Sequence, residues 1–279
     1  MFNKILSLYQ NLIVYPVEKY DLEHYYFYKS SKKDDIFGIS KKISTNEYEL
    51  IKTNFVEKKI YSLDNKIQKI YDYLLEKNPS PFKKNMRILI YQLNDQYKGI
   101  IEEFLKELIS EIKIVDILQY HVAIYPINKD IEFDKFFTTL SDDIGFPIIL
   151  HKGLIITQST QGEDVVRYIY AYDRTNKLKH NLYSEMPELI FNLHKDDYLE
   201  IINIIKNNLF KDIIEDDQLV NLINTFFEND LNVSQTAKQL YLHRNSLLNR
   251  LENIYSQTGF NIQKFSHATA VKVMLSINN

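Results

Sequence analysis

Apolar residues recur along the chain with two spacings, which predict a mixture of helices and strands. A spacing of three or four positions, typical of one helix face, occurs over residues 2–14, 45–55, 59–77, 97–111, 131–141, 162–172, 186–194 and 197–210. Short apolar or aromatic runs predict strands over residues 24–29, 36–39, 87–93, 112–118, 121–127, 145–150 and 154–157. The pattern therefore predicts a mixed α+β fold.

Two prolines separate the first segments from the rest of the chain. The run Asn78-Pro79-Ser80-Pro81 interrupts the helical pattern, because each proline removes a backbone donor and disfavours helix before it. We place a domain boundary there, at residues 78–86. The chain then divides into an N-terminal α/β domain (1–80), a middle domain (86–212) and an all-helical domain (213–279).

The N-terminal domain has a clear helix start and an aromatic run. Ser44 and Glu47 have the spacing of a capping box, and the polar residues 30–35 predict a hairpin turn. The aromatic residues 25–28 either line an effector pocket or form a strand with one buried face, since aromatics serve both purposes. A sensory or dimerisation role is the expectation for this domain.

The middle domain shows the order strand, helix, strand, strand, helix, strand. The second and third strands are close enough in sequence for a tight connection, which we place at Gln119-Tyr120. The order is that of a ferredoxin-like unit. We treat the predicted strands 145–150 and 154–157 as separate.

Two short helices joined by a turn are predicted over residues 232–259. Ser234 is the expected N-cap of the first helix, Tyr241-Leu242 forms the turn, and the second helix begins near His243. Its apolar stripe is formed by Leu247, Leu251 and Ile254. Two further helices flank this pair, one capped by Asp216-Asp217 and the last, residues 266–277, capped by Ser266.

The second helix of the pair carries polar side chains suited to reading DNA. Arginine can bond guanine, asparagine can bond adenine, and serine can bond either. In a helix-turn-helix the start of the second helix enters the major groove. The candidate DNA-binding residues are Ser234, Lys238, His243, Arg244, Asn245, Ser246, Asn249 and Arg250.

These residues resemble the C-terminal helix-turn-helix of the PucR/CdaR-type bacterial transcription regulators. The resemblance rests on His243-Arg244-Asn245-Ser246, Arg250-Leu251, Ile254 and Thr258-Gly259, and it covers residues 216–279. Two positions depart from the usual motif: Ser246 stands where threonine is common, and Asn249 stands where an aromatic residue is common. Both keep a polar group, so the departures concern base preference rather than DNA binding.

The resemblance implies a domain plan and a function. Many PucR/CdaR-type regulators have a degenerate GGDEF-like middle domain before the helix-turn-helix, and residues 86–212 are similar to it in pattern and position. A cyclase would need acidic residues for Mg²⁺ and a glycine-rich hairpin. Here Asn94 and Asp95 follow the first strand, and the hairpin Leu118-Gln119-Tyr120-His121 has no glycine. We expect no enzymatic activity.

Charge and composition narrow the classes of protein further. Residues 232–279 hold five basic residues and one acidic residue, a net +4, so the rest must carry −7 to give the chain's −3. A basic tail on an acidic body suits a protein that touches DNA with one end. There is no cysteine and no apolar run long enough to span a membrane. We expect a cytoplasmic protein.

No metal, cofactor or catalytic site is expected. The histidines, at positions 24, 121, 151, 180, 194, 243 and 267, lack the spacing of a helical metal site and are interpreted as ordinary surface or cap residues. The sequence thus favours a transcription regulator that binds double-stranded DNA as a homodimer, with a small-molecule effector as a further candidate partner. The alternatives are a protein-interaction adaptor with a vestigial helix-turn-helix and, less favoured, a cyclase-like enzyme that binds nucleotides.

Overall fold

The chain forms two compact units in the computed structural model. The structure describes residues 12–15, 17, 20–29, 36–127, 131, 133–176 and 182–277. The first unit is Met1–Asp72 and the second is Tyr73–Asn279. Most of the predicted helix 2–14 and all of the predicted turn 30–35 lie outside the described residues. The prediction of a helix is wrong for Ile13–Val14, which form a strand that pairs with Gly38 and Ile39.

The first unit contains a small antiparallel sheet. Its strands are β1 (Ile13–Val14), β2 (Tyr25–Lys29), β3 (Ile36–Ser40) and β4 (Val56–Glu57), in the order β1-β3-β2-β4. Helix α2 (Thr45–Asn54) packs on it through Ile51, which joins Tyr28, Phe37 and Phe55 in one core. The predicted capping box holds, because the Ser44 backbone N–H donates to the Glu47 carboxylate (3.2 Å).

Helix α3 (Asn65–Glu76) begins later than the predicted residue 59. The preceding segment is held by specific polar contacts instead of a helical turn. The Gln68 side chain accepts from the Tyr61 and Ser62 amides (2.7 and 2.9 Å), and the buried Lys58 ammonium pairs with Asp72. These contacts satisfy buried polar groups that the apolar periodicity does not take into account.

The second unit contains a five-stranded sheet in the order β6-β7-β5-β8-β9. Its strands are β5 (Met86–Gln92), β6 (Lys113–Ile117), β7 (Tyr120–Pro126), β8 (Ile149–Ile156) and β9 (Tyr183–Glu185). The first four pair antiparallel, and β9 lies parallel to β8. Its helices are α4 (Lys98–Leu108), α5 (Phe133–Ile144), α6 (Gly162–Asn176), α7 (Met186–Asn192), α8 (Tyr198–Ile205) and α9 (Lys211–Ile214), with a π-helical turn at Lys206–Phe210.

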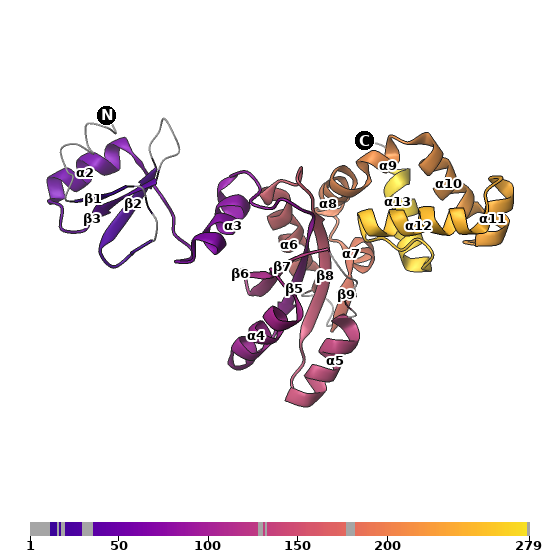
Figure 1. Cartoon of the computed structure of the whole chain (residues 1–279), viewed down its shortest axis with the longest axis horizontal. Helices are drawn as coiled ribbons and strands as arrows, with labels where there is room; N and C mark the ends of the chain where they lie inside the picture. Colours follow the sequence, from indigo (N-terminus) through magenta and orange to yellow (C-terminus); the bar gives the residue numbers. More distant parts are fainter. Residues whose placement is uncertain are drawn as a thin grey trace. The chain divides into compact units, whose positions relative to one another are not determined.

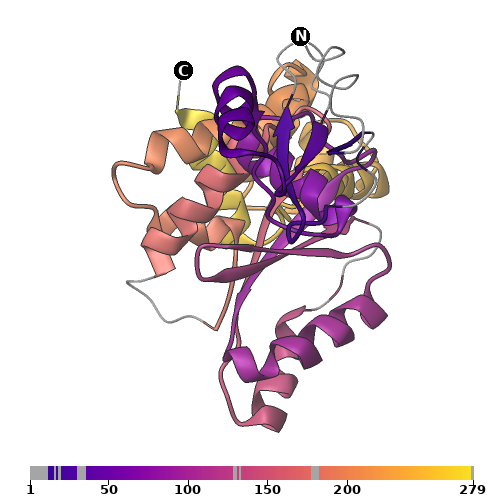
Figure 2. The same cartoon turned by 90° about the vertical axis from the view of Figure 1, so that its left-hand side faces the viewer.

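The elements of the second unit follow the predicted order, from β5 through α4, β6, β7 and α5 to β8. Leu89 and Tyr91 of β5 belong to the core under α4 and α5, which lie side by side (Figures 1 and 2). The rings of Phe104 and Phe136 stack between the two helices, with centroids 4.2 Å apart. All seven residues of β7 are buried, as in a sheet covered on both faces.

The predicted strands 145–150 and 154–157 are wrong as a pair, because residues Ile149–Ile156 form the single strand β8. Gly153, in the middle of β8, marks close packing rather than a turn. A Cβ at this position would lie 2.8 Å from Ile88 Cγ1, so a larger residue would collide with the neighbouring strand. The three-residue strand β9 was not predicted from the sequence.

Smaller differences concern the ends of elements. The turn between β6 and β7 lies at Leu118-Gln119, because Tyr120 already pairs with Ile117 in the ladder. Leu118 closes it with a positive φ of 56°. Helix α4 ends at Leu108 rather than at the predicted residue 111, and a short 3-10 turn (Asp95–Tyr97) precedes it.

The C-terminal part of the second unit is entirely helical among the described residues. It contains α10 (Asp217–Glu228), α11 (Val233–Gln239), α12 (Arg244–Thr258) and α13 (Phe265–Ser276). Asp216 caps α10 as predicted, by accepting from the Gln218 and Leu219 amides. Across the ranges that the structure describes, none of the helices is both long and apolar enough to cross a membrane.

Two predicted caps in this region are each wrong by two residues. Asn232, not Ser234, caps α11, because its side-chain oxygen accepts from the Gln235 amide (3.0 Å), and Ser234 lies in the first turn. Helix α13 starts at Phe265 after Lys264, so Ser266 also lies inside the helix rather than at its cap.

Candidate nucleic-acid interface

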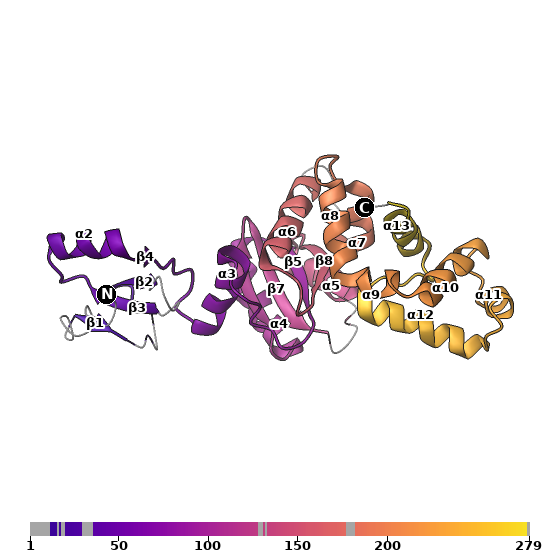
Figure 3. The same ribbon diagram turned by 90° about the horizontal axis from the view of Figure 1, so that it is seen from above.

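Helix α12 is fixed to its neighbours by the predicted apolar stripe. Leu247, Leu251 and Ile254 are buried, together with Phe226 of α10 and Val271 of α13. Burial of these side chains supplies the free energy that holds a short helix in place, since isolated helices of this length are marginal in water. Figure 3 shows α12 running from the α11 end of the molecule back toward α9.

The turn between α11 and α12 has a defined hydrogen-bond pattern. The Leu242 amide donates to the Ala237 carbonyl (2.8 Å), and the Tyr241 amide is within 3.3 Å of the Lys238 carbonyl. This pair of bonds is the Schellman motif, in which the residue after the helix adopts a left-handed conformation. Tyr241 has a φ of 54°, so the backbone between the two helices is fixed locally.

The outward side of α12 begins with asparagine and serine. Asn245, Ser246 and Asn249 are exposed and lie on the side away from the buried stripe. Arg244 and Arg250 are three residues before and after Leu247, so at about 100° per residue they lie on opposite flanks of that stripe. Arg244 is exposed, and Arg250 is partly buried.

The structure brings the remaining predicted residues near the same end of α12. His243 is the N-cap residue, although its side chain makes no capping hydrogen bond, and it is exposed. Ser234 and Lys238 are exposed on α11, one turn apart. Among the described residues, none of the eight predicted side chains has a hydrogen bond or ion pair to another protein group. Their donors and acceptors are therefore available to a partner.

The opposite end of α12 contacts the five-stranded sheet. Gly259 ends the helix with a φ of 78°, and a Cβ there would lie 2.3 Å from Arg87 Nη2 of β5 and 3.4 Å from Ile155 Cδ1 of β8. Only glycine combines this backbone conformation with such a close neighbour. The close packing of the C-terminal end of α12 against the sheet thus depends on glycine at position 259.

A hydrogen bond from the buried side chain of His267 joins α13 to β9 at the edge of the sheet. His267 Nδ1 accepts from the Asn261 amide (3.0 Å), so the proton of the ring is on Nε2, which faces Glu185 (3.4 Å). Burial alone would raise the pKa of Glu185. Hydrogen bonds from His267 and Tyr183 and the charge of Lys152 outweigh burial and lower that pKa to about 2.

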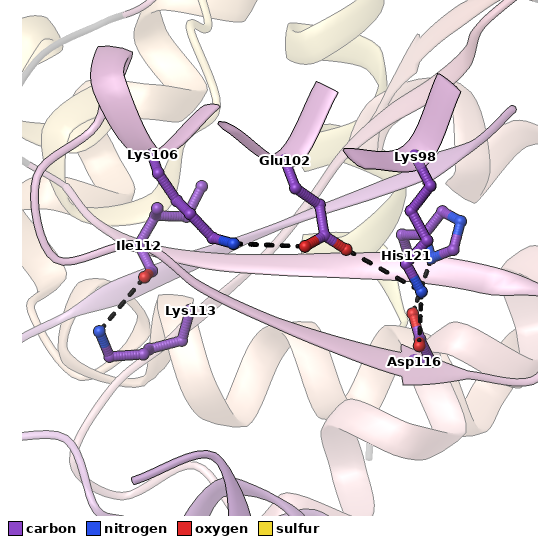
Figure 4. Close-up of polar contacts among 7 residues, drawn as sticks. All are labelled: Lys98, Glu102, Lys106, Ile112, Lys113, Asp116 and His121. Atoms are coloured by element: carbon purple, nitrogen blue, oxygen red, sulfur yellow. Dashed lines mark hydrogen bonds and ion pairs between the residues drawn. The ribbon is translucent and has the colours of Figure 1, made fainter. Parts of the chain in front are cut away.

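Ion pairs and hydrogen bonds join α4 to the β6–β7 hairpin. In the β6–β7 hairpin, Asp116 accepts from His121 Nδ1 (2.7 Å) and from Lys98 Nζ (2.9 Å), and Glu102 lies within 3.9 Å of Lys98 (Figure 4). Burial would raise the pKa of Asp116, but hydrogen bonds from Lys98 and His121 outweigh burial and lower it. Asn94 caps the 3-10 turn. No group of three candidate metal ligands occurs within the described ranges.

Three histidines differ from the expected surface or cap positions. His121 and His267 are buried, and His151 is completely buried. His151 lies between the Tyr168 hydroxyl (2.7 Å from Nε2) and the Ser184 hydroxyl (2.8 Å from Nδ1). Burial lowers its pKa to about 3, so it is neutral at ordinary pH. Partners on α6 and β9 make this burial possible, and no local sequence pattern indicates them.

Two comparisons by sequence found proteins similar to part of this chain. Residues 219–277 match the family model of the PucR C-terminal helix-turn-helix domain. The purine catabolism regulatory protein of Bacillus subtilis (strain 168) is 34% identical over 68 residues, which are 24% of this chain and 13% of that protein. This chain thus matches only a small part of that relative's length.

One solved structure resembles a larger part of the chain, at a low level of similarity. It is the regulator of polyketide synthase expression from Bifidobacterium adolescentis, which is 13% identical and has a TM-score of 0.39. The alignment covers 77% of this chain and 93% of that one. The sequence matches, the buried stripe of α12 and its exposed polar side point to the same assignment. Residues 219–277 therefore form a PucR C-terminal helix-turn-helix domain, the domain type of the PucR transcription regulators.

Proposed function

We propose that this chain is a sequence-specific DNA-binding transcription regulator without enzymatic activity, which reads operator half-sites as a homodimer through α12. The observation that carries the proposal is the unpaired polar side of α11 and α12, within a helix-turn-helix of a regulator family. A helix that served only for packing inside the protein would have no need for arginine, asparagine and serine together on its exposed sides.

The base contacts come from the side of α12 that points away from the protein. Asn245, Ser246 and Asn249 lie in its first two turns and have both donors and acceptors. An asparagine can bond adenine through two atoms, and a serine can bond either adenine or guanine. The first two turns of α12 therefore enter the major groove and determine the preferred sequence.

The phosphate contacts come from the flanks of α12 and from α11. Arg244 and Arg250 point to either side of the helix, so each can reach a different wall of the groove. Ser234 and Lys238 contact phosphates from α11, and His243 does so from the start of α12. These contacts position the protein on the duplex, whereas the base contacts specify the sequence.

The rest of the chain supports dimerisation and sensing in this proposal. A single helix-turn-helix reads only a few base pairs, so two copies are expected on half-sites about 34–36 Å apart. Residues 86–212 form a ferredoxin-like, degenerate GGDEF-like domain, and residues 1–80 form the domain that contacts a partner copy or a small-molecule effector. The strand order of the larger sheet supports the ferredoxin-like assignment. The proposal includes a cytoplasmic location.

The test begins with capture of DNA fragments bound to the protein in cells. Purified protein is then titrated with the most enriched fragment at several salt concentrations. We expect affinity to fall steeply as salt rises, because arginine and lysine release counterions from DNA. Arg250→Ala should weaken binding and reduce the slope of log affinity against log salt by about one.

Lys272→Ala is the matched control, since it removes an exposed positive charge from α13, outside the proposed contact surface. It should change affinity less than Arg250→Ala. A protein that prefers no fragment, ignores both the substitution and the salt, and copurifies with another protein would instead be an adaptor. Product formation from GTP or ATP with Mg²⁺ would contradict the absence of enzymatic activity.

A further inference from the structure

Tyr241 is an unusual residue for its backbone position. It follows α11 as the left-handed residue of the Schellman motif, with a φ of 54°. Glycine is preferred there, because a Cβ in the left-handed conformation crowds the following carbonyl. A tyrosine at this position therefore makes the turn less stable than a glycine would.

Packing does not compensate for this cost. The tyrosine side chain is 97% exposed, so its ring gains almost nothing from burial. No hydrogen bond or ring contact joins it to another side chain among the described residues. The stability of the folded protein thus gives no reason for a large aromatic side chain at this turn.

The other left-handed residues that follow helices of this domain differ from Tyr241. Asp230, which ends α10 with the same pair of backbone hydrogen bonds, is of a type that tolerates the left-handed conformation. Leu231, which follows it with a φ of 61°, is partly buried. Gly259 ends α12. Among these four residues, Tyr241 alone combines a bulky left-handed residue with an almost fully exposed side chain, and such outliers are frequent at functional sites.

The position of Tyr241 places it at the DNA-facing end of α12. It is three residues before Arg244, so their Cα atoms are at most about 11 Å apart. Lys238, whose carbonyl lies 3.3 Å from the Tyr241 amide, is on the other side of the turn. Tyr241 therefore lies in the chain between two residues proposed to contact phosphates, and its side chain is exposed to solvent.

We propose that the phenolic hydroxyl of Tyr241 donates a hydrogen bond to a phosphate oxygen beside the groove that α12 enters. The inference rests on the proposed function and adds a contact that the sequence motif did not indicate. Tyrosine hydroxyls are among the groups that bond DNA phosphates. The ring holds its hydroxyl away from the backbone, with two rotatable bonds to fix, so the contact costs little entropy on binding.

Two substitutions in the full-length protein separate this contact from a structural role. Tyr241→Phe keeps the ring and the backbone strain, so the melting temperature should stay the same while affinity for the captured fragment falls about threefold to tenfold. Tyr241→Gly relieves the strain, so the melting temperature should rise by about 2–4 °C while affinity falls by a similar factor. A gain in stability with a loss of binding is the signature of a residue retained for function.

The salt dependence and a control variant complete the test. The phenol is neutral, so neither variant should change the slope of log affinity against log salt, in contrast to Arg250→Ala. Asp230→Gly introduces glycine at the equivalent left-handed position after α10 and should cause no loss of affinity. Wild-type affinity in both Tyr241 variants overturns the inference. If the wild-type protein itself prefers no fragment, the proposed function fails as well, and the two failures are distinct.

Discussion

Asn249 is the residue at which this chain departs most from the related motif, because an aromatic residue is common there. Its side chain is exposed in the second turn of α12. In the proposed complex it lies over base edges, where an asparagine can discriminate adenine from the other bases. The identity of this one residue then decides part of the operator sequence.

Asn249→Ala should weaken binding to the preferred operator by about 1–3 kcal/mol, because the bonds to one base are lost. The preference at one position of the site should be relaxed at the same time. The measurement is the affinity for a panel of operators with single base changes. Lys238→Ala is the comparison and should weaken all members of the panel by similar factors. Equal losses across the panel for Asn249→Ala would assign this residue to the phosphates instead.

The sequence predicted residues on α12 well and buried polar residues poorly. Burial of Leu247 and exposure of Asn245 follow from helical periodicity alone, which a single sequence contains. His151 is buried because Tyr168 and Ser184 satisfy its ring nitrogens, and these partners come from other elements. The N-cap at Asn232 was missed since Ser234 is an equally good cap by residue type.

Among the elements, α12 is the most constrained at its C-terminal end. Gly259→Ala should destabilise the protein by about 1–2 kcal/mol, because alanine is strained at a φ of 78° and its Cβ would meet the buried guanidinium of Arg87. Thermal unfolding monitored by circular dichroism measures the change. Gly99→Ala in α4 is the control: nothing lies within 4 Å of its added Cβ, and alanine should stabilise that helix. Equal effects of the two substitutions would contradict this account.

The contact between α13 and β9 should make stability depend on pH in the acid range. Glu185 has a pKa of about 2 in the folded protein, below its usual 4.5. A carboxyl with a lowered folded pKa contributes stability above its unfolded pKa and loses it as pH falls through the folded value. This contribution, on the order of 3 kcal/mol, should therefore be complete above about pH 5 and be lost toward about pH 2.

Urea unfolding at several pH values in that window tests the contribution of Glu185. Glu185→Gln should be less stable than the wild-type protein at neutral pH, and the difference should shrink as pH falls. Glu252→Gln, at an exposed position of α12, should have the same free energy of unfolding as the wild-type protein at every pH. A difference in free energy of unfolding between Glu185→Gln and the wild-type protein that stays constant with pH would show that ionisation of Glu185 does not supply the stability.

Helices and strands with a regular spacing of apolar residues were predicted from the sequence. An element that is stabilised by pairing with another strand was not. The order from β5 to β8 and the helices α10 to α13 follow from apolar spacing. The strand β9 has three residues and is stabilised by pairing with β8, so it leaves no pattern of its own. The predicted strands 145–150 and 154–157 missed that β8 is continuous through Gly153, where close packing against Ile88 leaves no room for a side chain.

At the scale of the whole molecule, the proposed dimer requires two half-sites on one face of the duplex. Inserting about five base pairs, half a helical turn, between the half-sites should abolish tight binding, and inserting about ten should restore much of it. Affinity for the altered operators measures the effect, with the stoichiometry of the complex determined by light scattering. Binding that is indifferent to the insertion would show that each copy binds on its own.

The close approach of Gly259 to Arg87 couples the C-terminal end of α12 to strand β5. In the proposed function, the helix that reads DNA packs at its C-terminal end against Arg87 of β5 and Ile155 of β8, and the turn that joins it to α11 is short. A displacement of β5 would then move α12, including the residues proposed to contact the bases. In this proposal, β5 is where a signal from the rest of the protein would change which operators are occupied.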